Sequence, residues 1–182
     1  MSYLSLRFGM PLSFLVFIST AAAATEALPP LPLPEGPVLL TVKGEITETN
    51  GEGAARFDLA MLEELGVITY ETTTPWTVGK LQLEGVTLKG VLDRVGATGD
   101  LIFAEAFNDY SSEIPISDAI EDGAVIAFRM NGKEMTLRDK GPLWVVYHYD
   151  KNPTYTSEVY LTRSIWQLDR LTVKHSPTRS EH

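Results

Sequence analysis

The sequence of 182 residues contains no cysteine. This absence excludes disulfides, thiol catalysis, iron–sulfur clusters and cysteine-ligated zinc, so the fold must be held by its core alone. Histidine is also scarce, with His148 in the body of the chain and His175 and His182 near its end. One histidine cannot form a His-rich metal site. The motifs G-x-S-x-G, H-E-x-x-H and the P-loop are absent as well.

Positive charge is in short supply, with 15 basic against 24 acidic residues. Binding to nucleic acid depends on clustered Lys and Arg side chains, so no nucleic acid is expected as a partner. An anionic membrane surface is disfavoured for the same reason. Three of the carboxylates, Asp118, Glu121 and Asp122, are predicted to form a solvated face beside a helix end.

Residues 1–24 are predicted to be a signal peptide. Arg7 is the single charged residue among them, Pro11 to Ile18 is apolar, and Ala21 to Ala24 offers a small-residue cleavage site. The apolar run is shorter than the roughly 20 residues that span a bilayer, although an uncleaved anchor is the alternative. Cleavage near Ala23 or Ala24 would give a periplasmic or secreted protein with 14 basic and 24 acidic residues.

After the signal peptide, residues 25–37 are predicted to form a proline-rich linker that is extended and semi-rigid. A role in binding a partner is the alternative. Residues 38–174 are expected to form one domain and residues 175–182 a frayed tail.

The pattern of apolar residues predicts short helices scattered among many strands, which is an α+β fold. Asp58 and Thr87 are expected to cap helices over 59–65 and 88–95, and the sequence 47–55 is expected to be a loop. Asn131-Gly132 predicts a tight β-hairpin. Further strands are predicted at 38–46, 67–73, around 81–83, 101–107, 124–130, 143–149 and 170–173.

Aromatic and polar residues near predicted strand ends indicate a site for a flat polar heterocycle. A pterin ring needs stacking surfaces, a donor for its oxo group and acceptors for its 2-amino and N3 hydrogens, which Trp, Tyr, Asn, Asp and Arg side chains supply. The alternatives are that Trp144 and Trp166 are core residues, and that Asp109 and Tyr110 form a strand-end turn. The candidates are Trp76, Asn108, Asp109, Tyr110, Arg129, Arg138, Trp144, Tyr147, Arg163 and Trp166.

The order of these segments resembles the molybdopterin-binding domain of sulfite-oxidase-like oxidoreductases. The resemblance extends over roughly 38–173 and implies an α+β fold with a mixed sheet, short helices and a pocket for a pterin-type cofactor. It rests on GVTLKGVL from Gly85, NDY from Asn108, IP at Ile114, AFRMNG from Ala127, GPLWVVY from Gly141 and SIWQL from Ser164.

In catalytic members of that family, the corresponding region carries a cysteine that binds molybdenum. Here the stretch 67–76 offers Thr72, Thr73 and Thr74, whose hydroxyls are poor ligands for a soft metal but can hydrogen-bond a ligand. Small exported members without the cysteine are similar to pterin-binding regulators of membrane-bound signalling enzymes. The resemblance thus implies the periplasmic region of a membrane protein as a partner.

The leading hypothesis is a periplasmic protein that binds a pterin or molybdopterin without chemistry of its own, and in which molybdenum is doubtful. The alternatives are an oxidoreductase that holds molybdenum through the cofactor dithiolene alone, and an interaction module with a vestigial pocket. The expected roles are walls from Trp76, Tyr110, Trp144 and Trp166, acceptors from Asn108 and Asp109, anion contacts from Arg129, Arg138 or Arg163, and pocket hydroxyls from Thr72 and Thr73.

Overall fold

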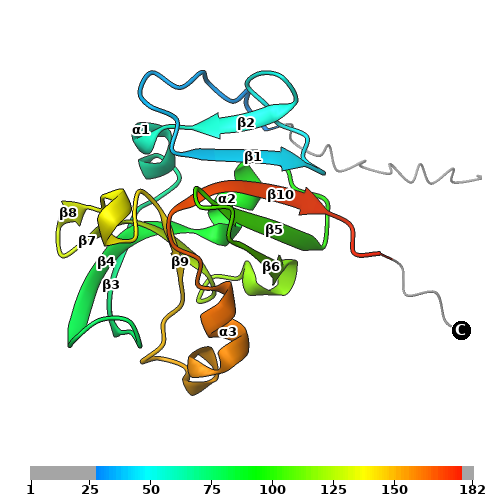
Figure 1. Cartoon of the computed structure of the whole chain (residues 1–182). Helices are drawn as coiled ribbons and strands as arrows, with labels where there is room; N and C mark the ends of the chain where they lie inside the picture. The colour runs from blue at the N-terminus through cyan, green and yellow to red at the C-terminus, as the bar shows by residue number, and fades with distance from the viewer. Residues whose placement is uncertain (1–27, 178–182) are drawn as a thin grey trace, which may run out of the picture.

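The computed structural model describes residues 28–177, which form two β-sheets with short helices around them (Figure 1). Sheet 1 has the strand order β2-β1-β10-β5-β6, and in sheet 2 the order is β3-β4-β7-β8, with β9 also paired to β7. The strands of sheet 1 are β2 (Ala54–Phe57), β1 (Leu40–Gly44), β10 (Leu168–Lys174), β5 (Leu101–Ala106) and β6 (Ser111–Pro115). Those of sheet 2 are β3 (Ile68–Thr73), β4 (Lys80–Thr87), β7 (Val125–Met130), β8 (Lys133–Glu134) and β9 (Trp144–Val146).

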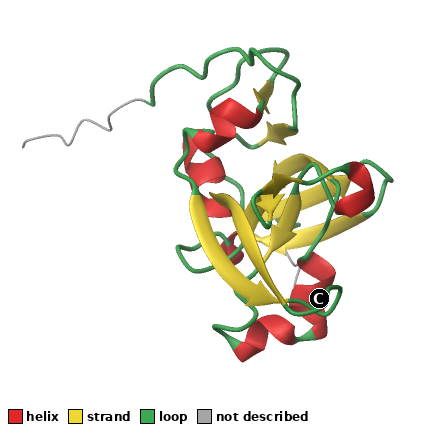
Figure 2. Cartoon of the chain, turned by 90° about the vertical axis from the view of Figure 1, so that its left-hand side faces the viewer, coloured by secondary structure: helices red, strands yellow, loops and turns green. Residues whose placement is uncertain are grey.

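The pairing of β1 with β10 is parallel, and the other strand pairings are antiparallel. Sheet 1 is therefore mixed, and it joins the first and last strands of the described chain. Figure 2 shows the strands at the centre of the molecule and the short helices at its periphery. The predicted α+β fold with a mixed sheet and short helices is confirmed.

Two helices begin where the sequence places their caps. Asp58 accepts a hydrogen bond from the backbone nitrogen of Met61 and precedes α1 (Leu59–Glu63). Thr87 accepts from the backbone nitrogen of Gly90 and precedes α2 (Leu88–Arg94). In both, the cap oxygen satisfies a backbone donor that has no partner within the helix.

The β7–β8 hairpin also forms at the predicted turn. Asn131 and Gly132 have φ angles of 53° and 72°. A two-residue turn with both φ angles positive matches the twist of the flanking strands, and Asn and Gly adopt it at low cost. The returning strand is short, since β8 ends at Glu134.

Three elements were not predicted. The loop expected over 47–55 contains the beginning of β2, and both β6 and α3 (Glu158–Arg163) form where no element was expected. Short 3-10 turns complete the chain as η1 (Ile116–Asp118), η2 (Leu137–Asp139) and η3 (Pro153–Thr156).

The proline-rich segment 28–37, which we call the strap, lies against the domain. The Asp58 carboxylate accepts hydrogen bonds from the backbone nitrogens of Glu35 and Gly36 at 2.8 and 2.7 Å. The Asn50 amide donates to the carbonyl of Pro32 at 2.7 Å, and Leu31 is buried. The carboxylate that caps α1 therefore also fastens the strap.

The predicted signal peptide, residues 1–24, lies outside the described residues. Within residues 28–177, no helix has both the length and the apolar character needed to cross a membrane.

Strands β7 and β9 have both faces buried, and this divides the core into two clusters. Ile126, Phe128 and Val145 belong to the main cluster, which includes α1, α2 and most of sheet 1. Ala127 and Trp144 are cross-strand partners that face the other way, into a smaller cluster. Because successive side chains of a strand point to opposite faces, the sequence WVV of β9 sends Trp144 and Val145 into different clusters.

Candidate functional site

A pocket of about 390 Å³ opens between the β5–β6 turn, α3 and the β3–β4 loop. Its volume lies within the range of roughly 300–1,000 Å³ that is usual for small-molecule sites. Three aromatic side chains line it, and Glu158 is the charged residue among the lining residues. The lining residues are Trp76, Asn108, Tyr110, Glu158, Leu161, Thr162, Ser164, Ile165 and Trp166.

One face of α3 forms a side of the pocket. Glu158, Leu161 and Thr162 are spaced i, i+3 and i+4, so their side chains lie together on the helix surface. Sequence reasoning missed these residues because it placed no helix here. The spacing itself, with Ser157 as an N-cap type residue before Glu158, was the signal that could have found them.

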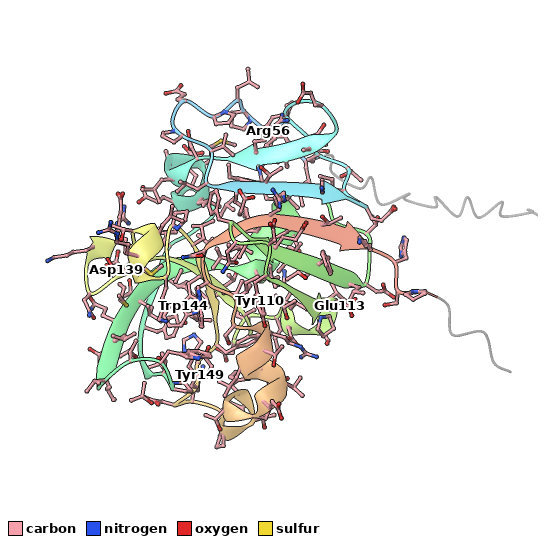
Figure 3. The ribbon with its side chains drawn as sticks, in the orientation of Figure 1. Arg56, Tyr110, Glu113, Asp139, Trp144 and Tyr149 are labelled. Atoms are coloured by element: carbon pink, nitrogen blue, oxygen red, sulfur yellow. The ribbon has the colours of Figure 1, made fainter. Side chains whose placement is uncertain are left out.

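The β5–β6 turn forms a neighbouring part of the wall. The Asn108 side-chain oxygen accepts a hydrogen bond from the backbone nitrogen of Tyr110 at 3.2 Å, and Asp109 has a φ of 62°. The Tyr110 hydroxyl lies 3.4 Å from the carbonyl oxygen of Thr162, which links the turn to α3. Figure 3 shows Tyr110 above the upper end of α3. Asn108 and Tyr110 line the pocket, whereas Asp109 belongs to the turn without lining it.

All three tryptophans of the protein meet beside the pocket. The Trp76 ring contacts Trp144 and Trp166 edge to face, with ring centroids 5.9 and 5.6 Å apart. Edge-to-face pairs of this kind place the positive ring edge against the negative face. Trp76 and Trp166 line the pocket, while Trp144 is fully buried behind them in the smaller core cluster.

Lys140 lies over these three indoles. Its Nζ atom is 4.2 Å from the ring centroid of Trp166, 5.2 Å from Trp144 and 6.0 Å from Trp76. These distances are in the range of cation–π attraction. Burial lowers the pKa of Lys140 from its ordinary value. Sequence reasoning overlooked this lysine because a single lysine after a turn carries no recognisable pattern.

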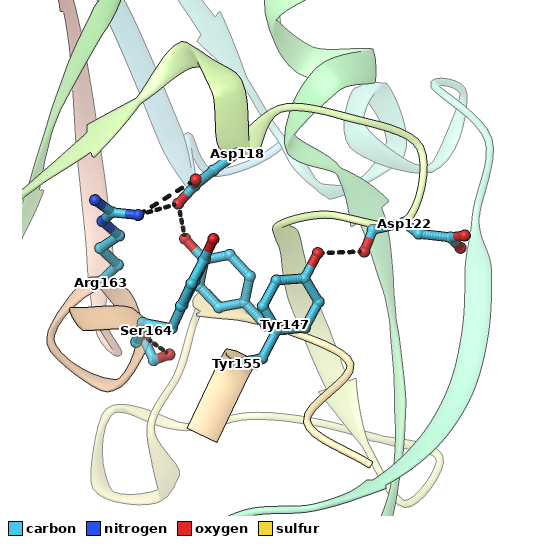
Figure 4. A network of polar contacts seen from close by, with 7 residues as sticks. Asp118, Asp122, Tyr147, Tyr155, Arg163 and Ser164 are labelled. Carbon is cyan, nitrogen blue, oxygen red and sulfur yellow. Dashed lines mark hydrogen bonds and ion pairs between the residues drawn. The ribbon is translucent and has the colours of Figure 1, made fainter. Parts of the chain in front are cut away.

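A buried polar network stands behind the pocket (Figure 4). The Tyr147 hydroxyl donates to the Asp118 carboxylate at 2.8 Å, and Arg163 donates to the same carboxylate at 3.0 Å. Burial, followed by the Asp118 charge, raises the pKa of Tyr147. Asp118 is 6% exposed, so the solvated face predicted for it is wrong. A carboxylate with both a tyrosine and an arginine partner is satisfied without water.

Ser164 follows Arg163 in the chain and lines the pocket. Its hydroxyl donates to the carbonyl of Tyr160 at 2.7 Å and lies 2.6 Å from the hydroxyl of Tyr149. Burial raises the pKa of Tyr149 to about 12, so this tyrosine is neutral at physiological pH. The hydrogen bonds of Ser164 therefore join neutral groups.

The threonines at the end of β3 are occupied by hydrogen bonds of their own. Thr72 is fully buried, and its hydroxyl accepts from the backbone nitrogen of Asp150 at 3.2 Å. The Asp150 carboxylate accepts from the backbone nitrogen and the hydroxyl of Thr73 at 3.0 and 2.5 Å. Neither threonine lines the pocket. Together these bonds tie the end of β3, just before the loop with Trp76, to the segment after β9.

The three candidate arginines lie away from the pocket lining. Arg129 pairs with Glu63 and Glu84, Arg163 pairs with Asp118, and Arg138 is exposed on η2. The structure thus brings together Trp76, Asn108, Tyr110 and Trp166 of the predicted set, with Trp144 directly behind. The ligand contacts of all these residues stay predictions.

Among residues 28–177, no group of three or more His, Asp or Glu side chains is placed to hold a metal ion. With cysteine absent from the sequence, the side chains near Thr72 offer hydroxyl oxygens and no thiolate. Hydroxyl oxygens are poor ligands for a soft metal.

The chain is similar to known proteins in its sequence family and in its fold. The model of the oxidoreductase molybdopterin binding domain family matches residues 57–180. The crystal structure of the sulfane dehydrogenase SoxCD from Paracoccus pantotrophus is similar with a TM-score of 0.55 and 16% identity, over 79% of this chain and 39% of that one. The chain thus spans about two-fifths of the length of that protein, and likeness at this identity concerns the fold alone. Curated protein sequences gave no match.

Proposed function

The chain belongs to the family of oxidoreductase molybdopterin-binding domains, and from this premise we propose that it is an exported protein that binds a pterin or molybdopterin in the α3 pocket without redox chemistry of its own. The family implies a molybdopterin-type cofactor and a small pterin ligand. The observation that carries the proposal is a pocket with aromatic walls in a chain of this family that contains no cysteine.

The pocket fits the ring of such a ligand. Trp76, Trp166 and Tyr110 offer stacking surfaces for a flat heterocycle, and the polar groups of Asn108 and Glu158 stand beside them. Apolar walls with a few convergent polar groups are typical of cofactor sites. A bound pterin would supply a conjugated ring with oxo, amino and ring N–H groups for these side chains to recognise.

Metal chemistry is poorly supported by the residues present. The hydroxyls of Thr72 and Thr73 are engaged with the segment at Asp150, and neither lies in the pocket wall. A hydroxyl that is already hydrogen-bonded would have to exchange its partner to approach a metal, and oxygen donors do not favour a soft metal. Export and a membrane-protein partner follow from the sequence expectations and form part of the proposal.

Binding can be measured with a variant that fills the pocket. Thr162 is exposed and lines the pocket, so Thr162→Phe should block it while the fold is preserved. Val159 lies on the same helix, is 54% exposed and does not line the pocket, which makes Val159→Phe the matched control. Because the three tryptophans lie in or behind the pocket, a bound pterin should quench their fluorescence in the wild type and in the control, but not in Thr162→Phe.

A thermal-shift assay gives a second measure, since a ligand at 100 times its Kd stabilises the folded state by about 2.7 kcal/mol. Failure of oxidised and reduced pterins and of molybdopterin to bind the wild type would contradict the proposal and favour an interaction module. Metal analysis of the protein from its native host distinguishes the binding protein from the other alternative, an oxidoreductase. Stoichiometric molybdenum would favour an oxidoreductase that holds the metal through the cofactor alone.

A further inference from the structure

Asn108 and Glu158 both line the pocket and differ in what they can offer a ligand. Asn108 uses its side-chain oxygen to accept from the backbone nitrogen of Tyr110. Its amide NH2 group makes no hydrogen bond to any of residues 28–177 and remains able to donate. The sequence expectation had Asn108 as an acceptor. Because the oxygen already accepts within the turn, we assign the NH2 group to the ligand.

Glu158 is the complementary group. Its side chain lines the pocket, and no salt bridge or side-chain hydrogen bond from another residue of the described chain reaches its carboxylate. An ionised carboxylate accepts hydrogen bonds and donates none, and its two oxygens can meet two parallel N–H groups.

A pocket that offers aromatic surfaces together with a donor and a double acceptor suits a particular class of ring. The ring must carry an acceptor followed along its edge by two N–H donors, which is the 4-oxo, N3–H and 2-amino edge of a pterin. On this basis we propose that Glu158 is a specificity-determining residue that reads the 2-amino and N3–H groups, while the Asn108 amide donates to the 4-oxo oxygen. The inference rests on the proposed function and adds to it the orientation of the ring.

Neighbouring carboxylates do not offer the same contact. Asp109 is part of the turn and does not line the pocket. Asp118 is already engaged by Tyr147 and Arg163. Glu113 is exposed on β6 and also lies outside the pocket lining. Removal of the Glu158 charge should therefore change recognition of the amino edge with no substitute nearby.

The test compares pterin with lumazine, a ring that has an oxo group in place of the 2-amino group. Affinities for the full exported chain are measured by calorimetry at neutral pH. The wild type should prefer pterin by about tenfold, which corresponds to about 1.4 kcal/mol. In Glu158→Gln, an amide of the same shape that places a donor opposite the 2-amino group, the preference should fall to within about twofold.

Two further variants sharpen the result. Glu113→Gln removes an exposed carboxylate outside the pocket and should keep the tenfold preference. Asn108→Asp replaces the donor by an acceptor and should weaken pterin and lumazine alike, since both rings carry the 4-oxo group. An unchanged pterin preference in Glu158→Gln would overturn the inference and leave the proposed function standing. Absence of pterin binding in the wild type and in Glu113→Gln would overturn both.

Discussion

Lys140 illustrates how one side chain can link the electrostatics of the site to an optical signal. Its ammonium lies over the rings of Trp76, Trp144 and Trp166, which are all the tryptophans that the protein has. Desolvation penalises the charged form of a partly buried lysine and lowers its pKa. The protonation of this single group is therefore reported by the whole tryptophan emission.

We predict that the tryptophan emission changes in a titration whose midpoint lies below the usual lysine pKa of about 10.4. The pKa of Lys140 is lower in the folded state, so between the folded and unfolded pKa values the unfolded state binds more protons. The contribution of Lys140 to the free energy of unfolding therefore rises as the pH increases through the folded pKa. Fluorescence recorded from pH 7 upward checks this. In Lys140→Met the transition should be absent, and its persistence there would assign it to another group.

Asp58 makes contacts beyond those of an ordinary helix cap. Its carboxylate accepts from Glu35, Gly36 and Met61, so it joins the strap to α1. The backbone hydrogen bonds of Met61 and then Gly36 lower the pKa of Asp58. The cap could be predicted from the sequence, but the strap contacts could not, because they depend on residues about twenty positions away.

Asp58→Asn should lower the free energy of unfolding at pH 7 by about 1–2 kcal/mol, since an amide oxygen is a weaker acceptor and its NH2 group would face backbone donors. The folded pKa of Asp58 lies below the unfolded value, so its contribution is present above about pH 4 and is lost as the pH falls through the folded pKa. Urea unfolding at several pH values measures this. The difference between wild type and variant should narrow in acid, and a constant difference would contradict the charge-based account.

Residue types alone identified several members of the site. Trp76, Asn108, Tyr110 and Trp166 all line the pocket, because stacking surfaces and amides near strand ends tend to face a common cleft. The arginines illustrate the limit of this reasoning. A guanidinium suits an anionic ligand and a neighbouring carboxylate equally well, and only the folded chain shows that Arg163 lies against Asp118.

At the scale of elements, what could be predicted depended on local signals. Helices α1 and α2 begin at side-chain caps, and the β7–β8 hairpin forms at Asn-Gly, which are contacts within a few residues. Strand β2, with the sequence AARF, is defined by its pairing with β1, and β6 by its pairing with β5. Such short edge strands have little propensity of their own, so tertiary contacts decide them.

Helix α3 is the unpredicted element with the greatest consequence. It has six residues, and no side chain caps its first turn. A helix this short is marginal by itself and depends on packing. Arg163, at its last turn, is bonded to Asp118 of η1, and Tyr147, adjoining β9, is bonded to the same carboxylate. The network of Figure 4 thus fastens α3 and the pocket wall to the core.

Tyr147→Phe removes one hydrogen bond of that network while Arg163 stays paired with Asp118. We expect a loss of about 1–2 kcal/mol in the free energy of unfolding, measured by urea denaturation. Tyr160→Phe is the control, because the Tyr160 hydroxyl makes no side-chain hydrogen bond to residues 28–177, and it should change stability by less than about 0.5 kcal/mol. Equal effects of the two substitutions would show that ring packing, and not the bond to Asp118, holds the wall.

At the scale of the whole molecule, sheet 1 is organised around its last strand. Strand β10 lies between β1 and β5, parallel to the first and antiparallel to the second. Leu168, Leu171 and Val173 of β10 are buried in the main core. A parallel pairing between the two ends of the domain has no local sequence signal, which is why the strands could be predicted and their order could not.

Removal of β10 should therefore abolish folding and not merely weaken it. A chain that ends at Gln167 would leave β1 and β5 without their shared neighbour and open the core. We expect it to show no cooperative thermal transition by circular dichroism. A chain that ends at His175, after the last residue of β10, is the matched control and should unfold cooperatively. Cooperative unfolding of the shorter chain would show that β1 and β5 can close the sheet without β10.

The parallel pairing of β1 with β10 also fixes when the domain can form. Thr41 pairs with Arg170 and Gly44 with Val173, so β1 must wait until every other strand of the two sheets has been synthesised before its partner β10 exists. Contacts between such distant segments slow folding, because the long loop between them must close first. A growing chain would therefore be unable to complete sheet 1 until β10 has been synthesised, and the ribosome would carry an open polypeptide until then.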